Sequence, residues 1–134
     1  MRLWHYELIR YLPKSQLLAQ WRELNSIFKK QNKHILINYV YEYPKEDLYS
    51  YSIMVIKEFL KRKIKINSFK NFLDYFGVIE IAKIEYKETP FVYHHNIRYL
   101  TQCFYNLQEK YDRGQKDFTD DIYTKLSYFY FQKM

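Results

Sequence analysis

Apolar side chains recur at helical spacing along much of the chain, and the clearest stripe lies near its start. Between residues 13 and 30 the stripe consists of Leu17, Trp21, Leu24 and Phe28. Steps of three and four residues place such side chains on one face of an α-helix and leave the other face polar. The pattern therefore predicts an amphipathic helix over residues 13–30, and a proline at its first position favours this start.

The same spacing predicts three further helices, over residues 44–63, 94–113 and 118–131. Two of them have well-marked apolar seams, namely Leu48, Tyr51, Val55 and Phe59 in one and Ile97, Leu100, Phe104 and Leu107 in the other. Gly114 follows the helix predicted over 94–113, and glycine often ends a helix because it adopts the left-handed conformation easily.

Two stretches, 35–41 and 78–84, are rich in β-branched residues and lack helical spacing. The first fits a strand or an extended connector between two helices. The second fits a strand or the extension of a helix over 67–76. Because no Gly/Ser-rich linker, low-complexity block or repeat divides the chain, we expect one all-α domain over residues 1–134. The economical arrangement is a bundle of three to four helices.

Length and composition limit the class of protein. The 134 residues, 48 % of them hydrophobic, suffice for one buried core. No apolar run approaches the roughly 20 residues of a membrane span, and the first residues lack the apolar region of a secretory signal. The single cysteine, Cys103, can form neither an internal disulfide nor a thiolate metal site. These features predict a cytoplasmic protein without a membrane segment, and we expect a monomer with Cys103 buried.

The charge and the aromatic content bear on whether the protein binds nucleic acid. The net charge is +7, from 22 Lys and Arg against 15 Asp and Glu, and aromatic residues make up 21 %, including 16 Tyr. Cations attract phosphates and aromatic rings stack on bases, so this composition suits a nucleic-acid partner. A Lys-, Ile-, Asn- and Tyr-rich chain is equally typical of an AT-rich genome, so composition alone leaves both explanations open.

The first predicted helix also carries a candidate site. Arg22 and Glu23 fall roughly opposite the apolar stripe, together with the small residues Ala19 and Ser26. One carboxylate and one guanidinium among small side chains leave room for a ligand. The alternative is that both charges are ordinary solvated residues of an amphipathic helix.

Residues 15–24, with the sequence SQLLAQWREL, resemble the pyrimidine-dimer DNA glycosylase family. The phage endonuclease V type carries a similar Leu-x-Ala-x-aromatic-Arg-Glu-Leu stretch at the same distance from its N-terminus. Phe28 and the pair Lys33-His34 extend the match. Residues 1–5 and Leu12-Pro13 resemble the bacterial branch of the family.

Later parts of the chain match more loosely. The helix ending Glu58-Phe59-Leu60-Lys61-Arg62 is similar to the Leu-Lys-Arg-Gly of the family, but Lys63 stands where the glycine would be. Tyr93-His94-His95 is a weaker third match. The resemblance is strong over residues 1–34 and loose after about residue 64.

The resemblance implies an endonuclease V-like fold and a DNA-repair glycosylase/AP lyase acting on duplex DNA with a pyrimidine dimer or an abasic site. Family members attack the sugar C1′ with the N-terminal α-amine, form an imine, release the base and cleave the strand by β-elimination. Glu23 matches the catalytic carboxylate of the family, and Arg22 matches a residue that holds a phosphate. The further residues expected at the DNA are Gln16, Ser26, Lys33, His34 and His94.

Three departures from the family concern the nucleophile and the DNA contacts. In the phage type a small residue follows Met, and Met is removed. Here Arg2 follows, and a bulky second residue normally prevents this removal, so the expected nucleophile is the amine of Met1, one residue further out than in the phage type. If Met1 is removed, the amine of Arg2 takes its place. Ser26 replaces a further arginine of the family. The C-terminal tyrosines, Tyr123, Tyr128 and Tyr130, are only similar in composition to an aromatic patch of the phage type.

Other kinds of site find no support in the sequence. The chain has no HExxH pattern or cysteine pair for zinc and no glycine-rich nucleotide-binding motif, so we expect neither a metal nor a small-molecule cofactor. Two alternatives to the enzyme remain open. One is a basic DNA-binding helical domain that kept the fold without catalysis, and the other is a protein-interaction bundle.

Overall fold

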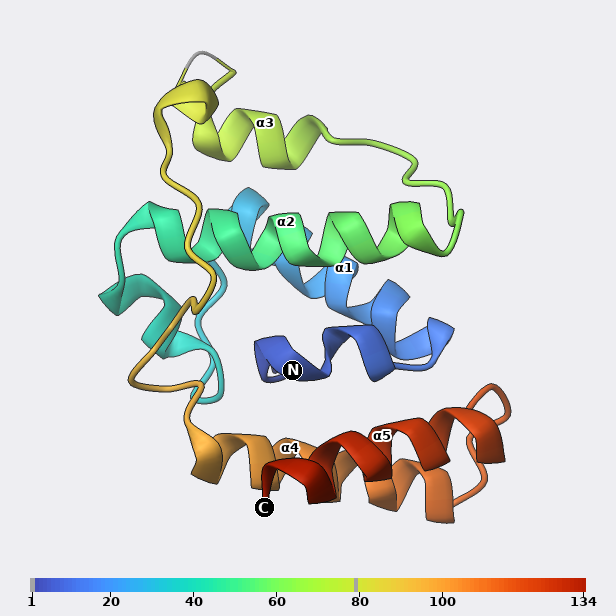
Figure 1. Ribbon diagram of the computed structural model, residues 1–134. Coiled ribbons are helices and arrows are strands. Elements are labelled where there is room, and N and C mark those ends of the chain that lie inside the picture. Colours follow the sequence, from blue (N-terminus) through green and yellow to red (C-terminus); the bar gives the residue numbers. More distant parts are fainter. Residues whose placement is uncertain (1, 79) are drawn as a thin grey trace.

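The computed structural model describes residues 2–78 and 80–134, whose helices are stacked in layers (Figure 1). These residues form five α-helices and three 3-10 helices and no strand. The α-helices are α1 (Lys14–Lys30), α2 (Lys45–Lys61), α3 (Lys70–Phe76), α4 (Ile97–Asp112) and α5 (Asp120–Lys133). The 3-10 helices are η1 (Tyr6–Tyr11), η2 (Asn38–Glu42) and η3 (Glu80–Lys83).

The all-α class and the four helices predicted from periodicity are confirmed, whereas the count of three to four helices is wrong. The additional α-helix is α3, which lies in the stretch 67–76 that the pattern left undecided. At seven residues, α3 is too short to show a full apolar repeat of its own. Its buried residues Phe72 and Phe76 nevertheless pack against Phe28 of α1.

The described residues of both β-branched stretches form no strand. Residues 35–37 make a turn that leads into η2. In the second stretch α3 ends before Gly77, whose φ of +81° is left-handed, and η3 follows at Glu80. A strand needs a partner edge for its backbone groups, and no partner occurs among the described residues, so the propensity of these side chains is overridden.

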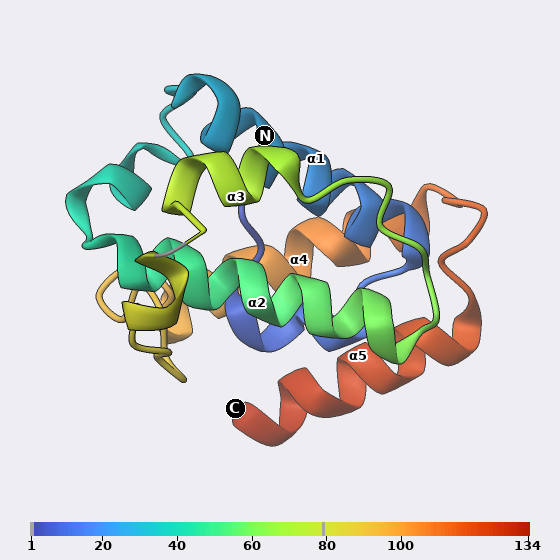
Figure 2. The same cartoon turned by 90° about the horizontal axis from the view of Figure 1, so that it is seen from above.

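The start of the described chain lies between the layers of helices and is mostly buried. The N-terminal segment, residues 2–12, runs between the α1–α2 layer and the α4–α5 layer (Figure 1), and η1 within it contacts both α2 and α5. Seen from above, α3 covers α1 and α2 on the side that faces away from the N-terminal segment (Figure 2). The segment is largely buried, with Leu3, Leu8 and Leu12 at most 1 % exposed.

Local signals explain where the long helices begin and end. Pro13 and Pro44 precede α1 and α2, and the Asn96 side chain accepts a hydrogen bond from the Tyr99 N–H at the start of α4. Gly114 ends α4 at a φ of +82°, as predicted. Cys103 is buried on α4, also as predicted. None of the described helices has the length and apolar character needed to cross a bilayer.

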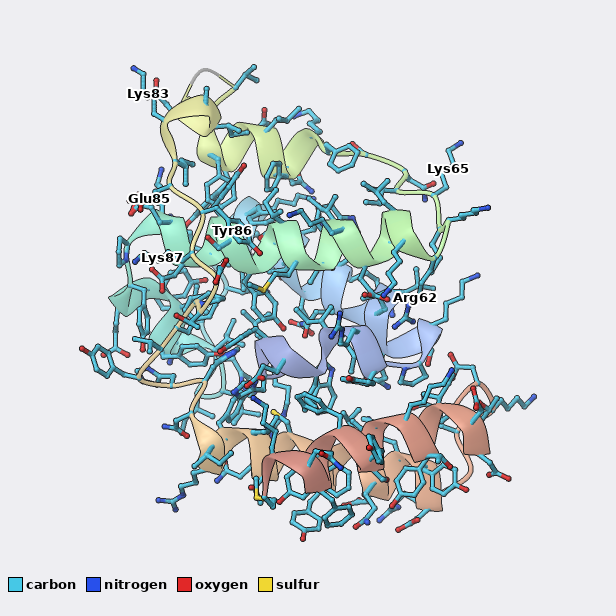
Figure 3. The ribbon with its side chains drawn as sticks, in the orientation of Figure 1. Arg62, Lys65, Lys83, Glu85, Tyr86 and Lys87 are labelled. Atoms are coloured by element: carbon cyan, nitrogen blue, oxygen red, sulfur yellow. The ribbon has the colours of Figure 1, made fainter. Side chains whose placement is uncertain are left out.

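The connection between η3 and α4 is bonded to α2. Asp47 is buried on α2, and its carboxylate pairs with Lys87 Nζ at 2.8 Å and accepts a hydrogen bond from the Phe91 N–H at 2.8 Å. Figure 3 shows Lys87 and its neighbour Tyr86 on this connection beside α2. The Lys57 ammonium of α2 lies 5.0 Å from the centre of the Tyr86 ring. These contacts fix the chain that leads into α4.

Candidate active site

A pocket of about 320 Å³ lies between the N-terminal segment, α1 and α4. It contains three residues predicted for the site, Arg2, Gln16 and Glu23. Ala19 lines it as well, so the small side chain does leave space beside the carboxylate. The rest of the wall consists of Trp4, Gln20, Leu36, Asn106 and Lys110.

Glu23 presents an unpaired polar atom. Its Oε2 is buried and has no hydrogen-bond partner among the residues that the structure describes. A buried carboxylate oxygen without a partner is costly, since it has lost its water and gained nothing in exchange. Arg2 and Lys110 add positive charge to the same pocket. The pocket therefore combines an available carboxylate with cationic walls.

Gln20 attaches the N-terminal segment to α1. Its side-chain amide donates to the Arg2 carbonyl at 3.0 Å, and its Oε1 accepts from the Trp4 N–H at 2.8 Å. The Tyr51 hydroxyl of α2 donates to the Trp4 carbonyl at 2.6 Å and lies 2.9 Å from Gln20 Oε1. Gln20 and Tyr51 are at most 1 % exposed. Burial raises the pKa of Tyr51 well above its ordinary value, so its hydroxyl remains a donor.

Tyr99 of α4 holds the segment from the other side. Its hydroxyl donates to the Leu3 carbonyl at 2.6 Å. The Arg2 guanidinium lies 5.7 Å from the centre of the Trp4 ring and 5.8 Å from that of Tyr99, within the range of cation–π attraction. Residues 2–4 are thus bonded to α1, α2 and α4. We call these hydrogen bonds of Gln20, Tyr51 and Tyr99 the clamp.

Two buried histidines continue this polar layer. His95 Nδ1 accepts from the Tyr6 N–H at 3.1 Å, so its ring proton is on Nε2, which lies 2.7 Å from the Tyr39 hydroxyl. Its ring stacks on His5 at 5.3 Å. Burial lowers the pKa of His95 well below the ordinary value and lowers that of His5 to about 4. Both histidines are therefore neutral at neutral pH.

Arg22 lies apart from Glu23, in a second groove of about 410 Å³ between α1 and the loop before α3. The groove is also lined by Asn25, Lys65 and Asn71, and the Asn71 amide donates to Asn25 Oδ1 at 3.1 Å. Lys65 is labelled on this loop in Figure 3 and points away from the body of the molecule. The polar face of α1 therefore lines both the Glu23 pocket and the second groove.

The remaining predicted residues that the structure describes lie outside the Glu23 pocket or, for Arg22, in the second groove. Ser26 accepts a hydrogen bond from the Asn32 amide. Lys33 and His34 are exposed on the loop after α1, next to the turn that carries Leu36 into the pocket. His94 is exposed, stacks on Tyr39 and lies 2.6 Å from the Tyr43 hydroxyl through Nδ1. Met1, the other predicted catalytic residue, lies outside the described residues.

Sequence reasoning missed several residues of the pocket and its supports. Gln20 did leave a signal, because it falls three residues after Leu17 and four before Leu24, where the stripe calls for an apolar side chain. A polar residue at a buried helix position needs a hydrogen-bond partner. Asn106 and Lys110 of α4 left no signal, since their approach depends on tertiary packing. In the described part of the chain, no three His, Cys, Asp or Glu side chains gather as metal ligands do.

Comparison with known proteins identifies the family of this chain. Residues 1–72 match the family described as Pyrimidine dimer DNA glycosylase. The matched region covers more than half of the 134 residues and contains Glu23, Gln20 and Tyr51. No curated protein and no solved structure matched the chain. The chain belongs to the pyrimidine dimer DNA glycosylases, a family of DNA-repair enzymes that act on damaged DNA.

Proposed function

We propose that this protein is a glycosylase/AP lyase that acts on pyrimidine-dimer or abasic duplex DNA through its N-terminal α-amine. The observation that carries the proposal is the buried, unpaired Glu23 Oε2 in a pocket that Arg2 also lines. We assign the reacting amine to residue 1, or to Arg2 after processing, because Arg2 lines the pocket that holds Glu23.

The α-amine suits nucleophilic attack at neutral pH. Its ordinary pKa is about 7.7–8.0, against about 10.4 for lysine, so a larger fraction is unprotonated. The amine nitrogen forms a bond to the sugar C1′ while the bond from C1′ to the base breaks. Ring opening then gives an imine, and β-elimination of the 3′ phosphate cleaves the strand.

Glu23 has two roles in these reaction steps. Its carboxylate stabilises the positive charge that develops at the sugar, and a negative group in a sheltered pocket does this more strongly than one in water. It also transfers protons during ring opening and elimination. Neither task requires a metal or a small-molecule cofactor.

The DNA contacts surround these groups. Gln16 reaches the sugar from the pocket wall, and Arg22 holds a phosphate from the adjacent groove. Lys33 and His34 contact the backbone from the loop after α1. Ser26 and His94 contribute polar contacts farther from the pocket. The net charge of +7 supplies the general attraction to duplex DNA, and we propose that the protein acts as a monomer.

The variant Glu23→Gln tests the proposal, with Glu109→Gln as its matched control. Glu109 is exposed on α4 and pairs with Arg113, so its substitution removes the same charge away from the pocket. We expect Glu23→Gln to bind an abasic duplex at least as tightly as the wild type and to cleave it about 100- to 10,000-fold more slowly, the range of general acid–base catalysis. The control should cleave at the wild-type rate.

Two outcomes contradict the proposal. If Glu23→Gln cleaves the duplex at the wild-type rate, the Glu23 carboxylate takes no part in the reaction. A wild-type protein that binds the duplex but never cleaves it would instead be a DNA-binding domain that kept the fold without catalysis.

A further inference from the structure

The turn after α1 presents an exposed aliphatic side chain beside the Glu23 pocket. Ile35 is 85 % exposed, the highest exposure among the large hydrophobic side chains of the described residues. Leu36, the next residue, lines the pocket itself and is 38 % exposed. Packing does not explain Ile35, because most of its surface is in water.

The turn is well braced. The Ile37 and Asn38 N–H groups both donate to the His34 carbonyl at 2.8 Å. Asn38 Oδ1 accepts from the His34 N–H at 2.7 Å, and His34 Nδ1 accepts from the Leu36 N–H at 3.2 Å. Ile37 is fully buried and anchors the base of the turn. Ile35 therefore sits at the tip of a fixed support rather than on a loose loop.

The surroundings of Ile35 identify the kind of partner. Lys33, His34 and Asn38 are exposed on either side of it, and Lys110 and Arg2 line the adjoining pocket. A protein partner would need a larger contiguous apolar patch, whereas only two neighbouring aliphatic side chains, Ile35 and Leu36, are exposed here among polar and cationic residues. Apolar wedges in a basic setting are used to separate stacked base pairs in duplex DNA.

We infer that Ile35 is a wedge that enters the base stack next to the nucleotide whose sugar reaches Glu23. This inference rests on the proposed function. The amine can attack C1′ only when the damaged nucleotide is drawn out of regular stacking. Ile35 fills the space between the separated base pairs, and Leu36 closes the pocket wall behind the sugar.

Ile35→Ser is the test variant, with Ile35→Leu as the conservative variant and Val78→Ser as the matched control. Val78 is 71 % exposed in the connection after α3 and does not line the Glu23 pocket. The DNA is a duplex with a non-cleavable abasic analogue and 2-aminopurine in the adjacent pair, whose fluorescence rises on unstacking. A second substrate is a natural abasic site, in duplex and in single-stranded form.

At saturating protein, we expect wild type, Ile35→Leu and Val78→Ser to raise the fluorescence and Ile35→Ser to lose most of the rise. Ile35→Ser should cleave the abasic duplex at least tenfold more slowly and the single strand at the wild-type rate, since the single strand has no stack to open. Equal loss on both substrates, or no loss on either, would overturn the wedge.

The two proposals can fail separately. If the wild type does not cleave any substrate, the proposed enzyme function fails. A fluorescence rise that depends on Ile35 would still support the wedge in that case. If cleavage depends on Glu23 but unstacking does not depend on Ile35, only the wedge is overturned.

Discussion

Lys63 occupies a position in a helix ending at which glycine is usual. It follows α2 with a φ of +59°, in the left-handed region. Its N–H donates to the Leu60 carbonyl, and the Ile64 N–H donates to the Phe59 carbonyl, which is the Schellman pattern of helix endings. Glycine is the usual residue at this position of a helix ending. The chain therefore keeps the ending of α2 while Lys63 adopts an unfavourable conformation.

We predict that Lys63→Gly stabilises the protein. Glycine removes the steric cost of the left-handed conformation, and the gain exceeds its greater loss of backbone freedom by about 0.5–1 kcal/mol. The free energy of unfolding, from urea denaturation, measures this gain. Lys61→Gly, within the last turn of α2, should instead destabilise by up to about 1 kcal/mol. A loss of stability in Lys63→Gly would contradict the interpretation.

At the scale of elements, the clamp fixes the position of residues 2–4 in the N-terminal segment. The N-terminal segment has little regular structure before η1, so its position depends on bonds to other elements. Gln20 of α1, Tyr51 of α2 and Tyr99 of α4 supply them. Three helices thereby determine the distance between Arg2 and Glu23.

Removing one hydroxyl from the clamp should affect stability and chemistry together. We predict that Tyr51→Phe lowers the free energy of unfolding by about 1–3 kcal/mol, because the buried Trp4 carbonyl loses its donor. Imine formation should slow at least tenfold, since a shift of about 1 Å in a reacting group can cost roughly 100-fold. Urea denaturation and the rate of borohydride trapping measure the two effects.

Tyr128→Phe is the matched control because its ring is 69 % exposed on α5. It should change neither quantity. Lower stability of Tyr51→Phe with an unchanged trapping rate would mean that the clamp only stabilises the fold.

Periodicity predicted the long helices because each buries one stripe, and α1, α2, α4 and α5 lie where their stripes indicated. It could not place α3 or the turn at 35–37, whose conformations depend on Phe28 packing and on side-chain caps such as Asn38. In the site, α1 and the family resemblance pointed to Glu23 and Gln16. The approach of Arg2 and Lys110 depends on how the N-terminal segment and α4 dock, and the pattern of one helix carries no information about docking.

At the scale of the whole molecule, neutral histidines join its two layers. His5 belongs to the N-terminal segment and His95 to the connection just before α4, and their rings stack in the interior. Their lowered pKa values mean that the folded protein stays unprotonated at both rings where the unfolded chain already takes up protons. The unfolded pKa is about 6.5. The stability from these groups is thus fully present above pH 6.5 and is lost as the pH falls toward 4.

We predict that the free energy of unfolding falls between pH 6.5 and 4, with each histidine adding up to about 1.4 kcal/mol per pH unit. His5→Asn should lower the slope of the unfolding free energy against pH by the contribution of about one proton. Asparagine can still accept the Glu7 N–H bond that the His5 Nδ1 accepts at the start of η1. Urea denaturation of both proteins across this range measures the slopes. Equal slopes would show that His5 does not account for the loss.

The most direct test of the central claim is borohydride trapping of the protein on duplex DNA, with one substrate abasic and the other UV-irradiated. The protein must be made without an N-terminal tag, and peptide mass spectrometry must identify the linked residue. We predict a covalent adduct at the N-terminal amine that disappears when this amine is acetylated. An adduct on abasic DNA alone would make the protein a lyase without dimer recognition. No adduct on either substrate, with duplex binding intact, would contradict the claim that the amine and Glu23 form an active site.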